Sequence, residues 1–420
     1  MEKIIYDQIY NYFSRNNILH NDMHGYRQNR STKTALLTMY DRWITAASKN
    51  QVTGVVLLDL SAAFDLVVPD ILIKKLDIYG LDSDFLIWIN SYLSDRYQSV
   101  WINHVYSSYQ GCKIGVPQGS NLGPLFFMIF LNDLLYGLSC NADNYADDTT
   151  LSATGTSLRE IEGKLNENCE KVSVWMGANL LKLNASKTHT LTVGTAQKLR
   201  NLERKVNVVL DNITLTEDSS QSELLLGCFV SSDLKWQNQV KSVVAKLKTR
   251  LSALEKLKFC GTFSIRKRLA DGLFSSVLSY CLPLYGGSRK EDIKMMQVLQ
   301  NKAAQVVCGF PPGSNRNILF DKVEWLSIRQ LIVYYTLITV FKIRISNEPE
   351  YLASKLNNVS RSGRIFLPKF DLVLCQNSFT YRGAVEWNKL PEVTRRCVKL
   401  STFKNDIKKY IRSKVSRFED

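Results

Sequence analysis

The chain has 420 residues, of which 45% are hydrophobic and 22% charged, a composition that excludes a disordered chain and allows about two or three domains. The net charge of +15 is unevenly distributed, because residues 51–150 carry 4 basic and 11 acidic residues whereas residues 241–420 carry 33 basic and 14 acidic ones. A basic surface suits a polyanion and a carboxylate cluster suits divalent cations, so the distribution favours a nucleic-acid-binding protein with an acidic centre. An ordinary solvated surface is the alternative explanation of the basic excess.

Several protein classes are disfavoured by simple patterns. The apolar runs at 125–131 and 331–341 are shorter than the roughly 20 residues that cross a bilayer. The N-terminal residues MEKIIYDQIY show neither a secretory signal nor a transit peptide. The nine cysteines are scattered singly, which excludes a CxxC redox pair and a paired-thiolate zinc module. We therefore expect an intracellular protein, cytoplasmic or nuclear, that does not bind a membrane.

The N-terminal half predicts helices around a buried strand. Residues 1–50 are mainly helical in pattern, and Val55–Leu58 form a continuous apolar run that ends at Asp59. Such a run is typical of a strand buried on both faces, so the Asp59 carboxylate is expected at a strand end. The segment 70–93 has helical periodicity, and 98–114 predicts a strand pair.

The next segments predict a loop, a buried helix and a tight turn. The loop GVPQGSNLGP at 115–124 leads into the apolar run 125–131, and Pro124 suits the first turn of that helix. YADD at 145–148 places two adjacent carboxylates in a predicted turn between strands, and 157–175 predicts an amphipathic helix.

The C-terminal half is predicted to be mainly helical and basic. Between 240 and 257 apolar residues recur with helical spacing while lysines and an arginine occupy the other positions. This helix suits a nucleic-acid backbone, and a solvated surface helix is the alternative. A further basic segment runs from 403 to 417.

Two aspartates are candidates for metal-dependent nucleotidyl transfer. That reaction uses divalent cations to activate a hydroxyl and to hold a triphosphate, so carboxylates must converge from separate segments. Asp59 and Asp147 have the required positions, although an isolated aspartate at a strand end or in a turn is common.

Five segments occur in order, and they read LLDLSAAFD (57–65), GVPQGSNLGPLFF (115–127), YADD (145–148), LKLNASKT (181–188) and LLGCFVSSDLKW (225–236). Together they resemble motifs A to E of the reverse-transcriptase palm, and they are most similar to LINE-type, non-LTR retrotransposon enzymes. HGYRQNRST at 24–32 resembles the preceding fingers motif, and SFTYRGAVEWNKLP at 378–391 resembles a C-terminal tract of jockey-like elements.

The resemblance implies an RNA-directed DNA polymerase, a nucleotidyltransferase that uses an RNA template, a DNA primer and dNTPs. It makes Asp59 and Asp147 the ligands of two Mg²⁺ ions, with Mn²⁺ as a substitute, and Asp148 the third carboxylate. Lys187 matches a lysine that protonates pyrophosphate, with a surface lysine as the alternative. Protein partners are not implied.

The same resemblance suggests nucleotide-binding residues. Phe64 matches an aromatic residue that excludes a 2′-hydroxyl, and a core phenylalanine is the alternative. Gln118 and Gly119 match a loop that contacts the incoming nucleotide or its template partner, and an ordinary turn is the alternative. Arg27 matches a fingers arginine that contacts template, triphosphate or a structural carboxylate. Asp65 is expected to cap the following helix.

The implied fold is an α/β right-hand polymerase with an antiparallel palm sheet backed by helices. The implied division is partial fingers at 1–50, palm with interleaved fingers elements at 51–235, thumb at 236–310 and a basic helical region at 311–420.

Three features depart from the family pattern. Met23 replaces a usual glutamine, Pro69 stands where histidine often follows motif A, and the first fingers motif is missing. We expect a chain that is N-terminally truncated relative to the family.

Three alternatives compete with this interpretation, and the first two are disfavoured by YADD with Phe64 and by the absence of a recognisable maturase tail after residue 310. A viral RNA-dependent RNA polymerase usually has GDD in place of YADD and lacks the Phe64 aromatic. A group II intron maturase would carry a DNA-binding or endonuclease tail. A catalytically inactive relic would retain nucleic-acid binding without turnover.

Overall fold

The structure is a computed structural model that describes residues 1–60, 62–215, 217, 220–259, 261–311, 313–370 and 372–414. The chain forms two compact units. The first unit comprises residues 1–35, 52–192 and 202–218, and the second comprises 36–51, 193–201 and 219–420. These units are defined by packing, and the fingers, palm and thumb boundaries stay a prediction.

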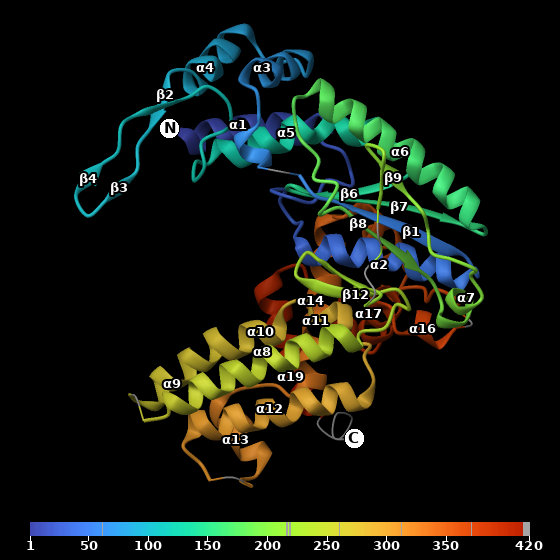
Figure 1. Cartoon of the computed structure of the whole chain (residues 1–420). Helices are drawn as coiled ribbons and strands as arrows, with labels where there is room; N and C mark the ends of the chain where they lie inside the picture. The colour runs from blue at the N-terminus through green and yellow to red at the C-terminus, as the bar shows by residue number, and fades with distance from the viewer. Residues whose placement is uncertain are drawn as a thin grey trace. The chain divides into compact units, whose positions relative to one another are not determined.

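The centre of the first unit is a four-stranded sheet in the order β6-β7-β1-β8 (Figure 1). Its strands are β1 (Val52–Leu58), β6 (Asn141–Tyr145), β7 (Asp148–Gly155) and β8 (His189–Val193). β7 pairs antiparallel with both β6 and β1. The predicted mixed α/β fold with an antiparallel sheet is confirmed.

Burial explains why these segments are strands. All but one of the β1 residues are buried, as the continuous apolar run predicts. Helix α6 (Leu158–Ala178) packs on β7 and β1, and the serine that precedes it, Ser157, caps its N-terminus. Helix α5 (Leu122–Tyr136) is buried almost all round, which fits its uniformly apolar sequence.

Three more helices lie in the first unit. Helix α1 (Glu2–Arg15) packs on α5, and α3 (Pro69–Ile78) packs on α4 (Ser83–Leu93) and on α5. The predicted helical segment 70–93 is therefore two helices. The break follows from Gly80, whose φ of +86° ends α3, and from Asp82, which caps α4.

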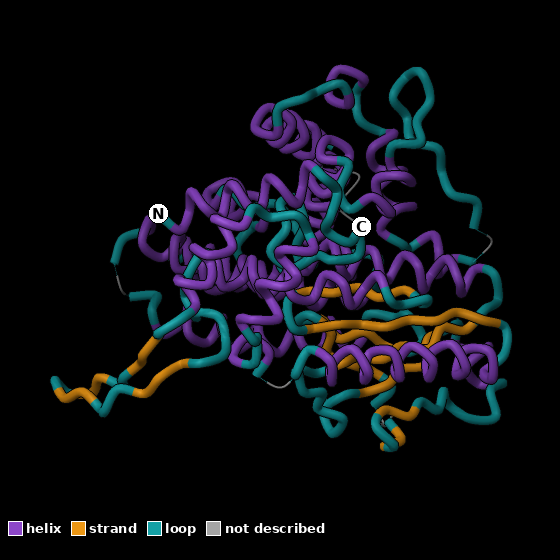
Figure 2. Tube along the Cα trace, turned by 90° about the horizontal axis from the view of Figure 1, so that it is seen from above, coloured by secondary structure: helices purple, strands orange, loops and turns teal. Residues whose placement is uncertain are grey.

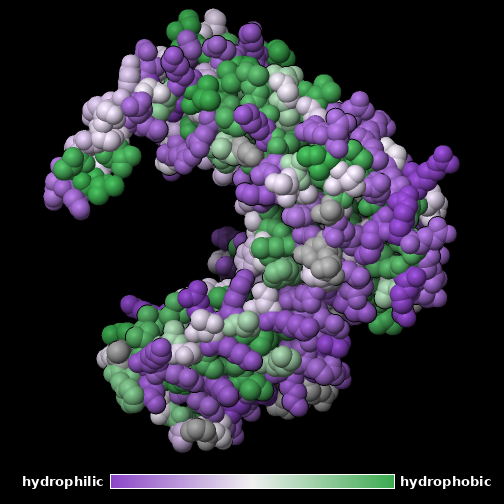
Figure 3. All heavy atoms as spheres, in the orientation of Figure 1, coloured by the Kyte–Doolittle hydropathy of each residue, from purple (hydrophilic) through white to green (hydrophobic). Residues whose placement is uncertain are grey.

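The predicted strand pair at 98–114 is a long hairpin that projects as an arm in Figure 2. Its paired segments are β2 (Arg96–Gln98) with β5 (Gln110–Cys112) and β3 (Trp101–Ile102) with β4 (Val105–Tyr106). Figure 3 shows hydrophobic atoms gathered at its end, where Trp101, Ile102, Val105 and Tyr106 are all exposed.

Short elements connect these parts. The first unit contains a 3-10 turn at Ala63–Asp65 and the strands β9 (Val209–Leu210) and β10 (Ile213–Thr214). The second contains α7 (Ala196–Arg200) and the hairpin of β11 (Ser222–Leu225) and β12 (Cys228–Ser231). Helix α2 (Thr32–Ser48) begins in the first unit and continues in the second.

The second unit is mainly helical, as predicted. Its remaining helices are α8 (Gln237–Lys256), α9 (Phe263–Ala270), η2 (Asp271–Ser275), α10 (Ser276–Ser279), α11 (Leu282–Tyr285), α12 (Lys290–Cys308), α13 (Arg316–Val323), α14 (Ile328–Ser346), α15 (Glu350–Leu356), α16 (Val373–Gln376), α17 (Phe379–Asn388), α18 (Glu392–Arg395) and α19 (Leu400–Ser413). Helix α8 buries its apolar stripe and exposes its basic residues, so the predicted amphipathic helix is confirmed. Its role in nucleic-acid binding stays a prediction, and the end of the basic segment 403–417 lies outside the described residues.

One part of this unit passes a composition test for membrane spans. Within the described residues the segment Arg316–Ser346, which contains α13 and α14, is long and apolar enough to cross a membrane by length and composition alone. The core helix of a folded protein passes the same test, and 61% of the most apolar window of this segment is buried.

Candidate active site

Strand register brings the predicted carboxylates to one edge of the sheet. The final pair between β1 and β7 is Leu58 with Thr149. Because antiparallel partners advance in opposite directions, Asp59 and Asp148 are the next residues on facing strands. Both lie just beyond the last β1–β7 pair, at the same end of the sheet, and Asp148 still pairs with β6.

The third carboxylate lies at the tip of the adjoining hairpin. Tyr145 pairs with Asp148, which leaves Ala146 and Asp147 as a two-residue loop. Ala146 has φ +57°, as tight hairpins of twisted strands require at such positions. Asp147 is exposed there. The predicted turn between strands is confirmed.

Electrostatics indicates that these three carboxylates form one cluster. The pKa of the Asp148 carboxyl is raised, first by partial burial although the side chain retains exposed surface, and then by the negative charges of Asp147 and Asp59. Repulsion of this kind favours binding of a cation at the cluster.

The donor set fits divalent cations that also bind substrate. Within the residues described, no group of three or more His, Cys, Asp or Glu side chains is placed so that it could hold a metal ion by itself. Mg²⁺ usually takes only one or two carboxylates and completes its shell with water and substrate phosphates. Asp59, Asp147 and Asp148 therefore fit Mg²⁺ as partial ligands, and which ions they bind stays a prediction.

The HGYR segment packs directly against the YADD hairpin. His24 donates its backbone N–H to the carbonyl of Asn144 at 2.7 Å, and Asn144 donates to the carbonyl of Asp22 at 2.9 Å. A Cβ on Gly25 would lie 2.5 Å from the backbone nitrogen of Ala146. Only glycine allows this close approach, so Gly25 lets the HGYR segment pack directly against the YADD hairpin.

Asp59 is held through its backbone by the motif D loop. Its N–H donates to Thr188 Oγ1 at 3.3 Å, and its carbonyl accepts from the Asn184 N–H at 2.9 Å. Thr188 Oγ1 in turn donates to the Asn184 carbonyl at 2.9 Å. Lys187 is exposed on this loop, four residues after Leu183, which forms an isolated bridge with Leu60. The loop thus joins Lys187 to the strand end that carries Asp59.

Phe64 lies in a partly exposed aromatic cluster. Its ring stacks on buried Phe127 with centroids 4.2 Å apart, and it meets Tyr26 edge-on at 6.3 Å. The pKa of Tyr26 is raised by burial and then by the charge of Asp147, which relates this cluster to the carboxylates. The Phe64 side chain is therefore partly buried. Its role in excluding a 2′-hydroxyl stays a prediction.

Motif A and the motif B loop run side by side. The Gly115 N–H donates to the Val67 carbonyl at 2.7 Å, and the Val116 N–H donates to the Phe64 carbonyl at 3.0 Å. A Cβ on Gly115 would lie 2.9 Å from the Cα of Asp65, so glycine permits the contact.

The expected capping role of Asp65 is wrong. Helix α3 has Val68 as its N-cap, without a side-chain cap bond. Asp65 ends the preceding 3-10 turn and accepts a hydrogen bond from Gln118 Nε2 at 2.7 Å. Gln118 and Gly119 are exposed in the loop, and Gly119 has φ +83° with nothing near its Cβ position.

Arg27 belongs to the HGYR segment and is half-buried. Its Nη1 donates to the His20 carbonyl at 2.7 Å. A contact of Arg27 with template or triphosphate stays a prediction.

Several supporting residues were not predicted from the sequence. Tyr26, Asn184 and Thr188 all belong to segments that were recognised as motifs, but their individual contacts depend on tertiary structure. The buried pair of His24 Nε2 and Asp143 Oδ1, 3.5 Å apart, was also missed. Burial lowers the pKa of His24, and this residue stands at the start of the HGYR segment, which was the only available signal.

The carboxylates at the hairpin tip and at the end of the neighbouring strand form a candidate cation-binding centre, the kind of site that metal-dependent nucleotidyl transfer requires. The family comparison agrees with this class. Residues 1–260 match the model of the family described as reverse transcriptase (RNA-dependent DNA polymerase). The chain belongs to this family.

Curated relatives come from transposable elements. The chain is 25% identical over 328 residues to a probable RNA-directed DNA polymerase from transposon BS of Drosophila melanogaster, covering 74% of this chain and 35% of that protein. It is 27% identical over 304 residues to the RNA-directed DNA polymerase from mobile element jockey of Drosophila funebris, covering 68% and 32%. The predicted similarity to non-LTR, jockey-like enzymes is confirmed. The chain spans about a third of the length of these relatives.

Solved structures give a weaker match. The apo telomerase of Candida tropicalis aligns with a TM-score of 0.42 and 11% identity, covering 84% of this chain and 55% of that one.

Proposed function

We propose that this chain is the polymerase core of an RNA-directed DNA polymerase of a non-LTR retrotransposon. It extends a DNA primer on an RNA template by transferring nucleotides from dNTPs to the primer 3′-hydroxyl. The observation that carries this proposal is the register that aligns Asp59 with Asp148 beside the Asp147 hairpin. Family membership supports it independently.

Each site residue has a distinct task in the proposed reaction. Asp59 and Asp147 hold the divalent cations, with Asp148 as the third carboxylate. When bound, two Mg²⁺ ions supply activation of the 3′-hydroxyl and neutralisation of the triphosphate. The Thr188 and Asn184 bonds to the Asp59 backbone keep its carboxylate in position.

The surrounding residues orient the nucleotide. Phe64, whose ring stacks on Phe127, packs against the sugar and excludes a 2′-hydroxyl. Gln118, oriented by Asp65, and Gly119 contact the nucleotide or its template partner. Lys187 donates a proton to the departing pyrophosphate, for which its exposed position on the clamped loop is suitable.

Template and substrate choice test this proposal on the wild-type chain. With oligo(dT) primer and Mg²⁺, incorporation of dTTP on poly(rA) is expected, and UTP is expected to be used far less. Poly(dA) measures the preference for an RNA template. Incorporation of UTP on poly(rA) in preference to dTTP would contradict the proposal and favour an RNA polymerase. No incorporation with either nucleotide, by a protein that still binds the primer–template, would favour an inactive nucleic-acid-binding relic.

A further inference from the structure

The jockey-like tract at 378–391 is only partly explained by folding. Ser378 caps α17, and Phe379, Trp387 and Leu390 are buried in the second unit's core. Asn388 exchanges two hydrogen bonds with the backbone of the residue at 365, both at 2.8 Å. These residues hold α17 in place, but they do not account for Tyr381, for Val385 or for the positive charge of Arg382.

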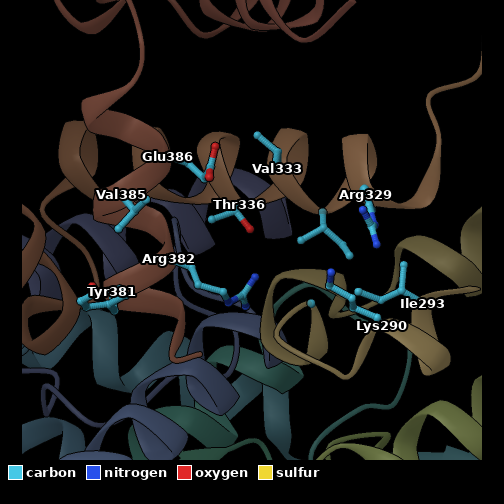
Figure 4. Close-up of a pocket in the computed structure, with 11 residues that line it drawn as sticks. Lys290, Ile293, Arg329, Val333, Thr336, Tyr381, Arg382, Val385 and Glu386 are labelled. Carbon is cyan, nitrogen blue, oxygen red and sulfur yellow. The ribbon is translucent and has the colours of Figure 1, made fainter. Parts of the chain in front are cut away.

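Those three residues line a cavity within the second unit. Its volume is about 370 Å³. Figure 4 shows side chains reaching this cavity from α12, α14 and α17. Its lining includes Lys290, Arg329, Arg382, Tyr381, Ile332 and Val385. A volume of this size is in the range of small-molecule and cofactor sites, roughly 300–1,000 Å³.

Three cations line this cavity without carboxylate partners. Among the described residues, Lys290, Arg329 and Arg382 form no ion pair within 4.0 Å. Arg382 is held rigidly, because its Nε donates to the Asn377 carbonyl at 2.9 Å and its Nη2 donates to the Pro283 carbonyl at 2.5 Å. Burial lowers the pKa of Arg382 to about 10, and the nearby Tyr40 and Glu386 oppose this shift only in part.

The remaining lining residues are mostly apolar. Ile332 is buried in the wall, and Val385 and the ring of Tyr381 are partly exposed to the cavity. Glu386 is the carboxylate among the lining residues, and it pairs with Lys389 at 2.9 Å. The cavity therefore combines excess positive charge with an apolar and aromatic surface.

We propose that this cavity binds one nucleotide unit of a nucleic-acid strand. Lys290 and Arg329 bind the phosphate, and the nucleoside packs against Tyr381, Ile332 and Val385. Aromatic faces stack with any base, and cations bind phosphate without reading sequence, so the site is expected to be tolerant of sequence. The proposal goes beyond nucleotidyl transfer, because none of the residues that line this cavity belongs to the carboxylate cluster.

The test compares two charge-matched double variants of the full chain. Lys290→Gln with Arg329→Gln removes cations from the cavity. Lys294→Gln with Lys342→Gln removes the same charge from exposed positions on the same two helices, α12 and α14, which do not line the cavity. Arg382 is left intact because its bonds to two carbonyls support the fold.

Binding of a short labelled oligothymidylate is measured by fluorescence anisotropy over a series of salt concentrations. The cavity variant is expected to bind about tenfold more weakly than wild type, as the loss of a charged hydrogen bond predicts. Its slope of log affinity against log salt is expected to fall by about 0.7, the contribution of one phosphate on a single strand. The control variant is expected to bind like wild type. If it binds as weakly as the cavity variant, net charge alone explains the loss, and the proposal is overturned.

Crosslinking and competition locate the ligand. A photoactivatable thymidine in the oligonucleotide is expected to label the peptide that contains Tyr381 in wild type and in the control, and to lose this label in the cavity variant. Thymidine monophosphate is expected to compete better than inorganic phosphate. Equal competition would identify a site for free phosphate, and absence of the Tyr381 label from wild type would exclude the cavity; either result overturns the proposal. Neither readout requires polymerase activity, so failure here is distinguishable from failure of the proposed enzyme.

Discussion

Gln118 donates a hydrogen bond from Nε2 to Asp65 Oδ1 at 2.7 Å, and this bond joins the motif B loop to the motif A turn. Loss of either partner should misorient the nucleotide-binding loop. We expect Asp65→Ala and Gln118→Ala each to raise KM for dNTP more than they lower kcat. In the double variant the losses should be less than additive, with a coupling of about 0.5–3 kcal/mol, typical of residues in contact. Steady-state kinetics of all four proteins measures this coupling. Asp65→Asn, which keeps an acceptor oxygen, serves as the control, and fully additive effects would contradict the link.

Asp148 should destabilise the folded protein at neutral pH. Its raised carboxyl pKa means that the folded state binds the proton more tightly than the unfolded state does. The cost is absent below the ordinary aspartate pKa of 3.8, appears as pH rises from there through the raised pKa, and is complete at neutral pH. Asp148→Asn should therefore raise Tm at pH 7, by on the order of one or two degrees because solvent screens the charge.

The same variant should lower extension activity, because it removes a carboxylate of the cluster. Thermal unfolding at neutral and acidic pH checks the stability effect, and the gain in Tm should shrink toward acid. A lower Tm at neutral pH together with normal activity would contradict the assigned electrostatic role.

Phe64→Val should open the sugar pocket. The missing ring leaves space for a 2′-hydroxyl, and each 1.4 kcal/mol of lost discrimination corresponds to about tenfold in rate. We expect the ratio of dNTP to rNTP incorporation efficiency to fall by orders of magnitude. Phe64→Tyr keeps the ring on Phe127 and should keep the selectivity. A folded, active Phe64→Val protein with unchanged selectivity would show that Phe64 is only a packing residue.

Gly25→Ala should disrupt the hairpin that carries Asp147. The added Cβ would lie 2.5 Å from the Ala146 nitrogen, and backbone on both sides prevents relief. We expect extension to fall by about a hundredfold or more, as a displacement of about 1 Å near a reacting centre predicts. The matched control is Gly163→Ala on α6, where nothing lies within 4 Å of the added Cβ. That change should stabilise the protein by about 1 kcal/mol and leave activity unchanged. Equal activity of Gly25→Ala and Gly163→Ala would refute the role of Gly25.

Local patterns predicted most of the elements that carry the site. The apolar run that ends at Asp59 became β1, YADD became a hairpin, and the spacing of residues 240–257 became α8. Each of these features depends on residues close together in the chain, such as a continuous apolar run, a turn or a helical spacing, so sequence alone is sufficient.

The contacts between motifs could not be predicted in the same way. Asp65 has a residue type suited to a cap, but Gly115 brings the motif B loop against it and supplies Gln118 as its partner. The division at Gly80 was missed because helical periodicity continues on both sides of it. The cavity lined by Lys290, Arg329 and Arg382 joins residues that are far apart in sequence, and no local pattern indicates that they converge.

The most direct test of the account is single-nucleotide extension by Asp59→Asn and Asp147→Asn proteins. Both changes remove a carboxylate from the cluster without altering the backbone bonds that hold it. Asp77→Asn, an exposed aspartate on α3, is the control with the same chemical change. We predict that both cluster variants lose Mg²⁺-dependent extension of oligo(dT) on poly(rA), by at least about a thousandfold, while primer–template affinity stays within about twofold of wild type. The Asp77→Asn protein should extend normally. Extension by Asp147→Asn at the wild-type rate would contradict the central claim.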